Sequence, residues 1–192
     1  MGLYGILDAM LHLDLVSIHA IQSFQPYWLT MLMRLVSWLL APEFCVPILV
    51  GILLVLFLRH KRAMDSVMIA LLAGNVLPLV LKPVFHVIRP SSAQAVILDV
   101  QSSYSMPSGH AVASVTIAAC IYLFLQRRGR VSRITIAALV CSVVLVGYSR
   151  VYLGAHWPSD VVTGWGIGIV WVLCIWHGIR PHLIRDIKKN TS

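Results

Sequence analysis

Three short segments concentrate the residues that could carry out chemistry. The first is Lys82 followed by Arg89-Pro90, the second is Pro107-Ser108-Gly109-His110, and the third runs from Ser149-Arg150 through His156 to Asp160. Each segment adjoins a long apolar run, where polar side chains are costly and therefore indicate function. Together they supply three cations, two histidines, a serine and a carboxylate.

These residue types suit a tetrahedral oxyanion such as phosphate. Lys82, Arg89 and Arg150 provide fixed positive charge, and the planar guanidinium group of arginine matches phosphate oxygens. Ser108 offers a hydroxyl group at the expected start of a helix, whose free N–H groups attract anions. Gly109 permits close approach of the backbone. The expected chemistry is therefore phosphate binding.

The two histidines add a reactive centre to this cationic set, because the nucleophile and the general acid can then be separate groups. Asp160 follows His156 by four residues, so it can hold one ring nitrogen and leave the other for attack. His110, His156 and Asp160 could instead form a two-histidine, one-carboxylate metal site, but the nearby cations would repel a metal ion. The three cations alone could anchor lipid headgroups, which would not account for the histidines.

Long apolar runs must position these segments. Of the 192 residues, 59% are hydrophobic and 11% are charged, whereas a soluble domain is about 25% charged. Charge-free runs predict five transmembrane helices, at 44–58, 66–81, 111–126, 134–149 and 161–176. This composition excludes an ordinary soluble domain and indicates an all-α, polytopic membrane helical bundle.

The basic residues predict the orientation of this bundle. The net charge is +8, and most of the 15 Lys and Arg residues form three clusters, which follow the first, third and fifth runs. Cytoplasmic loops collect positive charge, so these clusters mark the cytoplasmic side. Lys82, Arg89 and Arg150 then lie on the extracytoplasmic side, with the two histidines. Because topology and phosphate binding account for the charge, no nucleic acid partner is expected.

The N-terminal region has a different pattern. Pro26 separates two one-sided apolar stripes at helical spacing, one from Leu3 to Leu13 and one from Leu29 to Leu39. Such helices usually lie in the membrane interface, and Arg34 argues against a span, although a sixth span over about residues 16–40 is the alternative. We therefore expect an outside N-terminus, interfacial helices (1–41), a transmembrane bundle (42–179) and a basic cytoplasmic tail (180–192).

Two further features concern the surroundings of the three segments. The loop 91–106 is expected to shape the entrance to the site, with Asp99, Gln101 and Tyr104 as its polar candidates. His86 is expected to be structural or to lie at the rim. Gly164 and Gly168 form a GxxxG pair, which predicts close packing against another helix.

Taken together, the three segments resemble the signature of the type 2 phosphatidic acid phosphatase superfamily. All three parts are present, in order and with the family's spacing, within about residues 44–176. The resemblance implies that His156 attacks phosphorus to form a phosphohistidine, that Asp160 orients His156, and that His110 protonates the leaving oxygen and then activates water. It implies no metal or other cofactor, and a phosphate-binding set of Lys82, Arg89, Ser108, Gly109 and Arg150.

The resulting hypothesis is an integral membrane phosphatase that removes the terminal phosphate of a lipid phosphate or diphosphate at the extracytoplasmic face of the cell membrane. The bacterial members that the chain resembles include undecaprenyl diphosphate and phosphatidylglycerophosphate phosphatases. Undecaprenyl diphosphate is favoured, because a small outward-facing bundle suits recycling of a carrier lipid. The alternatives are a phosphotransferase acting towards another lipid or sugar, a phosphatidic acid phosphatase, and a headgroup-binding transporter or scaffold. Inhibition by vanadate is expected.

Overall fold

The computed structural model describes residues 3–39, 51, 54 and 73–190. The named elements are α1 (Leu3–Gln22), α2 (Tyr27–Leu39), the short 3-10 helix η1 (Gly74–Val76), α5 (Leu77–Phe85), α6 (Gly109–Arg127), α7 (Arg133–Tyr152) and α8 (Pro158–Asn190). Every regular element in these ranges is helical, which confirms the predicted all-α class for the described part of the chain.

Three of the described helices are long and apolar enough to cross a membrane. They cover Gly109–Gln126, Arg133–Tyr152 and Pro158–Gly178, which confirms the third, fourth and fifth predicted spans as membrane-capable helices. The first predicted span, 44–58, lies outside the described residues apart from positions 51 and 54, and only the end of the second, 66–81, is described. Helix α8 continues to Asn190, so the segment predicted as a basic tail is helical that far.

The outward surface of the bundle is strongly apolar. Ile134 on α7 is 81% exposed, and Val162 and Val170 on α8 are also mostly exposed. Exposed apolar surface costs about 25 cal/mol per Å² in water, so this surface requires a lipid environment. The protein is therefore a membrane protein.

Helices α6 and α8 approach closely because of two glycines. A Cβ atom at Gly164 would lie 2.7 Å from the carbonyl oxygen of Ser108 and 2.8 Å from Cβ of Ala111. A Cβ atom at Gly168 would lie 2.9 Å from Cβ of Val115. The predicted GxxxG pair therefore sets the distance between α6 and α8, as small residues do in membrane bundles.

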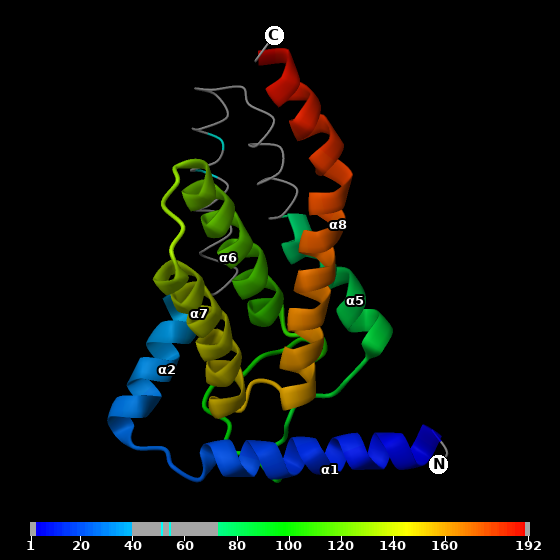
Figure 1. Cartoon of the computed structure of the whole chain (residues 1–192). Coiled ribbons are helices and arrows are strands. Elements are labelled where there is room, and N and C mark those ends of the chain that lie inside the picture. Colours follow the sequence, from blue (N-terminus) through cyan, green and yellow to red (C-terminus); the bar gives the residue numbers. More distant parts are fainter. Residues whose placement is uncertain (1–2, 40–50, 52–53, 55–72, 191–192) are drawn as a thin grey trace.

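The N-terminal helices lie against one end of this bundle. In Figure 1, α1 crosses below the lower ends of α6, α7 and α8, and α2 runs beside α7. The chain leaves helical geometry over residues 23–26, because Pro26 lacks an N–H group and disfavours helical geometry in the preceding residue. The alternative of one continuous span over residues 16–40 is therefore wrong.

Helices α1 and α2 contact the bundle through both apolar and polar residues. Ile18 of α1 and Met33 of α2 are buried in apolar clusters with residues of the bundle. Asp14 on α1 is 8% exposed, and its carboxylate accepts hydrogen bonds from the backbone N–H (2.8 Å) and the hydroxyl (2.6 Å) of Ser159. Leu13, in the predicted stripe of α1, is 64% exposed, whereas Ser37 on α2 is buried. Other apolar residues of these helices, such as Leu13, stay exposed, where lipid can cover them.

We predict that Gly164→Ala destabilises the protein by about 1–3 kcal/mol, the usual cost of overpacking a tight contact. The added methyl group would meet a backbone oxygen that cannot move without shifting the start of α6. Gly166→Ala is the matched control, because nothing lies within 4 Å of its added Cβ. Denaturant unfolding in detergent micelles measures both variants, and equal stabilities would contradict this packing role.

Candidate active site

The predicted site residues gather at the lower end of the bundle in Figure 1, where the interhelical connections meet. Lys82 lies in the last turn of α5, Arg89 in the loop after it, Ser108 and Gly109 at the start of α6, His110 in its first turn, Arg150 in the last turn of α7, His156 in the loop before α8 and Asp160 in the first turn of α8. Four helices and two loops therefore contribute to one site.

The end of α5 directs the chain towards Arg89. His86 follows the helix in the left-handed conformation (φ 51°), and its backbone N–H donates to the carbonyl oxygen of Lys82. This conformation is uncommon outside glycine and needs support from its surroundings. The ring nitrogen Nε2 of His86 lies 2.9 Å from the hydroxyl group of Tyr104. His86 therefore ties α5 to the loop that precedes α6.

The neighbours of His156 define which of its two ring nitrogens carries the hydrogen atom and which carries the lone pair. Nε2 lies 3.2 Å from Nη1 of Arg89, and a guanidinium group can only donate, so Nε2 carries the lone pair. Nδ1 then carries the hydrogen, and it lies 3.5 Å from Oδ2 of Asp160 and 3.4 Å from Oγ of Ser105. The nitrogen that can act as a nucleophile is therefore Nε2.

Ser105 is a site residue that was not predicted. It is fully buried, and its hydroxyl donates to Oδ2 of Asp160, so an oxygen lone pair remains for the Nδ1–H group of His156. The backbone N–H of Trp157 donates to the same carboxylate oxygen at 2.8 Å. Ser105 lies two residues before the second segment, among other serines, and no spacing distinguishes it from them.

Burial and positive charge both act on the site's titratable groups. Burial lowers the pKa of His156 well below its usual value, and the charges of Arg89, Arg150 and Lys82 lower it further. Burial, followed by the charge of Arg150, lowers the pKa of Arg89 to about 10. At neutral pH His156 is therefore uncharged, while Arg89 remains a cation.

Lys82 and Arg89 converge on Ser103. Nζ of Lys82 donates to the Ser103 hydroxyl at 2.8 Å. Nε of Arg89 donates to the Ser103 carbonyl oxygen at 2.6 Å, and Nη2 of Arg89 donates to the Ser103 hydroxyl at 3.2 Å. Both cations line a cavity of about 630 Å³, together with Gln101 and Tyr104 from the loop predicted to shape the entrance.

Arg150 and His110 line a second cavity of about 320 Å³, which shares Gln101 with the first. The guanidinium group of Arg150 donates to the hydroxyl of Ser37 on α2. Arg34 lines the same cavity. Helix α2 therefore contributes to the site, which its apolar stripe did not indicate.

The start of α6 has a polar group without a partner at Ser108 and open space beside Gly109. Ser108 occupies the N-cap position, as predicted, but its side chain makes no capping hydrogen bond. Its buried hydroxyl has no hydrogen-bond partner among the described residues. A Cβ atom at Gly109 would meet only Cβ of Pro78, at 3.9 Å. This arrangement suits a bound anion, because the first N–H groups of a helix lack partners within the helix.

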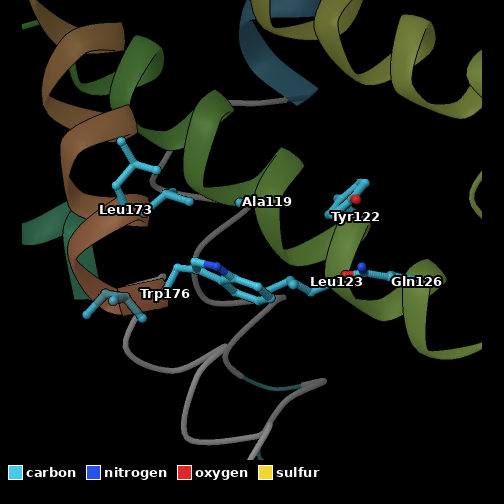
Figure 2. A pocket seen from close by; sticks show the side chains of 8 residues that line it. Ala119, Tyr122, Leu123, Gln126, Leu173 and Trp176 are labelled. Atoms are coloured by element: carbon cyan, nitrogen blue, oxygen red, sulfur yellow. The ribbon is translucent and has the colours of Figure 1, made fainter. Parts of the chain in front are cut away.

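A separate pocket of about 300 Å³ lies between the end of α6 that is remote from the site and the middle of α8 (Figure 2). Its lining residues are Ala119, Tyr122, Leu123, Gln126, Val172, Leu173, Ile175 and Trp176. None of the predicted site residues lines this pocket, so the candidate chemistry belongs to the two polar cavities.

Known proteins share this chain's sequence pattern. The family model for the PAP2 superfamily matches residues 63–183. Phosphatidylglycerophosphatase B of Bacillus subtilis (strain 168) is 33% identical over 170 residues, which cover 82% of this chain and 78% of that protein. Undecaprenyl-diphosphatase of Sulfolobus acidocaldarius is 36% identical over 119 residues, which cover 60% of this chain and 55% of that protein.

Two solved structures share the fold. The crystal structure of a transmembrane PAP2 type phosphatidylglycerolphosphate phosphatase from Bacillus subtilis has a TM-score of 0.78 and 25% identity, over 90% of this chain and 87% of that one. The crystal structure of Aquifex aeolicus LpxE has a TM-score of 0.69 and 25% identity, over 86% of this chain and 95% of that one.

We predict that His156 stays neutral at pH 6.5, where an ordinary histidine is half protonated. The lowered pKa means that protonation occurs only at more acidic pH, and Arg89→Gln should raise this pKa because it removes a neighbouring positive charge. Nitrogen-15 NMR of histidine-labelled protein in detergent measures both titrations, with His156→Gln to assign the signal. An ordinary pKa in the wild type, or a lower one in the variant, would contradict the electrostatic argument.

Proposed function

Because the chain belongs to the PAP2 superfamily, we propose that it is an integral membrane phosphatase that removes the terminal phosphate of a lipid phosphate or diphosphate. The geometry of His156 carries this proposal, since Nε2 carries its lone pair beside Arg89 and Nδ1 faces Asp160. The names of the relatives, phosphatidylglycerophosphatase B and undecaprenyl-diphosphatase, support phosphorylated lipids as the substrate class.

His156 would be the nucleophile. Its Nε2 attacks phosphorus in line, a phosphorus–nitrogen bond forms, and the bond from phosphorus to the leaving oxygen breaks. The ring becomes positively charged in this step, and the carboxylate of Asp160 stabilises that charge through the Nδ1–H group. Ser105 would act as a positioning residue, because its hydroxyl fixes the carboxylate that faces the ring.

The phosphate-binding set would be Lys82, Arg89, Ser108, Gly109 and Arg150. Phosphoryl transfer depends mainly on positioning and on stabilising the charge of the transferring group. Arg89 contacts Nε2 of His156, and the charges of Arg150 and Lys82 also lower the pKa of this ring. The buried hydroxyl of Ser108 and the open space at Gly109 support contacts with the remaining oxygens.

His110 would be the general acid and base. It donates a proton to the leaving oxygen and then removes a proton from the water that hydrolyses the phosphohistidine. Its place in the second cavity, beside Arg150, supports this role, because that position is close to the phosphate-binding cations yet separate from Asp160 and Ser105.

The site would face the extracytoplasmic side of the cell membrane. The basic clusters support this orientation, because they lie on the side opposite to Lys82, Arg89 and Arg150 in the predicted topology. The outward apolar face of α1, which crosses the site end of the bundle, supports placement of the site at headgroup depth. A substrate held by its lipid tails would reach the site by lateral diffusion.

Two lipids are candidate substrates for the proposed activity. Undecaprenyl diphosphate is favoured by the small outward-facing bundle and by the undecaprenyl-diphosphatase relative. Phosphatidylglycerophosphate is favoured by the relative whose match covers 82% of the chain. Transfer to a second lipid or sugar, in place of water, would use the same phosphohistidine.

We predict that His156→Ala lowers phosphate release by roughly 10³-fold or more, because no other group can form the covalent intermediate. The assay measures free phosphate from undecaprenyl diphosphate, phosphatidylglycerophosphate, phosphatidic acid and a water-soluble monoester, with and without an acceptor lipid. His12→Ala is the matched control, since His12 is exposed on α1 and lies outside the site. Full phosphate release by His156→Ala would overturn the nucleophile assignment.

A further inference from the structure

A carboxylate lies inside the cationic site. Oδ2 of Asp99 is 2.7 Å from Nη2 of Arg150, whose side chain is 1% exposed. The charge of Asp99 also acts on Arg89. A short, charge-assisted contact of this kind is the one that an arginine makes with a phosphoryl oxygen. Asp99 therefore occupies a position that suits a substrate anion.

The backbone of Asp99 is held in place. The N–H groups of Leu98 and Asp99 both donate to the carbonyl oxygen of Leu153, at 2.9 and 3.2 Å. The side chain of Gln22 accepts from the N–H group of Val96 and donates to its carbonyl oxygen, both at 2.8 Å. Because these contacts anchor the segment, Asp99 can leave Arg150 by rotation of its side chain without movement of the loop.

The surroundings of Asp99 allow such a rotation. Its side chain is 28% exposed, and its other carboxylate oxygen accepts a hydrogen bond from Gln101 at 3.1 Å. Asp99, Arg150 and His110 all line the open cavity of about 320 Å³. Arg150 keeps a second contact, with Ser37, so it does not depend on Asp99 alone for its orientation.

We propose that Asp99 is an internal competitor for the phosphate site, whose carboxylate holds Arg150 until a phosphoryl group displaces it. The inference rests on the proposed function, since it concerns the same site. Three cations would bind product phosphate as well as substrate, and slow release of product limits turnover in many enzymes. The return of Asp99 to Arg150 weakens the binding of free phosphate and favours its release.

The test compares wild-type protein with Asp99→Asn, which keeps the shape of the side chain but removes its charge. Binding of inorganic phosphate and of orthovanadate is measured by calorimetry in detergent, without any lipid substrate. We expect Asp99→Asn to bind inorganic phosphate about tenfold more tightly, because no internal anion opposes it. Asp99→Glu retains the charge and should stay closer to the wild type.

A matched control separates this competition from a general change in charge. Val100 is the next residue and is 85% exposed, so Val100→Lys makes the same change in net charge on the solvent side of the loop. We expect it to alter phosphate binding by less than about twofold. An equal gain in both variants would overturn the proposal, and so would weaker phosphate binding by Asp99→Asn, which would make Asp99 a positioning residue for Arg150.

A measurement on the wild type covers the case in which Asp99→Asn does not fold. Saturating inorganic phosphate should shift the carbon-13 signal of the Asp99 carboxylate, and an unchanged signal would overturn the proposal. These binding measurements use no lipid. A failure of the proposed function would appear separately, as an absence of phosphate release from every lipid in the panel.

Discussion

The gathering of positive charge at one end of the bundle is the constraint on which the rest of the site depends. Lys82, Arg89 and Arg150 lie close enough to act together on His156, and Arg150 lowers the pKa of Arg89. Like charges that are partly removed from water are stable only when acceptors surround them. The loop before α6 supplies these acceptors, with the Ser103 carbonyl for Arg89 and the Asp99 carboxylate for Arg150. Its conformation therefore follows from the cations that it covers.

The N-terminal helices stabilise this arrangement by presenting polar faces to it. Asp14 accepts two hydrogen bonds at the start of α8, next to the residue that faces His156, and Ser37 accepts one from Arg150. In a membrane the apolar faces of such helices can meet lipid, so the polar faces are free to serve the site. The apolar residues of α1 and α2 divide between the bundle, where Ile18 and Met33 are buried, and the outer surface, which lipid can cover.

The sequence predicts the parts of this structure that depend on local pattern. Hydropathy predicted α6, α7 and α8, and the three motif segments predicted His156, Asp160 and the cations as site residues, which the fold brings to one end of the bundle. The sequence did not locate Ser105 or Ser37, nor the role of Asp14 at the start of α8, because their contacts join residues that are far apart in the chain. Ser37 and Arg150 are separated by 113 positions, and Asp14 and Ser159 by 145. Such pairs have no periodic signal, and single polar residues do not reveal their partners.

In the proposed mechanism, the positive charge of the site has two roles that place opposite demands on His156. Phosphate binding requires cations, while nucleophilic attack requires an uncharged histidine with a free lone pair. Burial and then the charge of Arg89, which donates towards Nε2, lower the pKa of His156, so the cation proposed to bind phosphate would also help to keep the ring neutral before substrate arrives. In the proposed mechanism, attack would make the ring positive, the bound phosphoryl group would offset the charge of Arg89, and the carboxylate of Asp160 faces Nδ1. The electrostatic cost of charging His156 would therefore fall only when substrate is present, which would couple reactivity to binding.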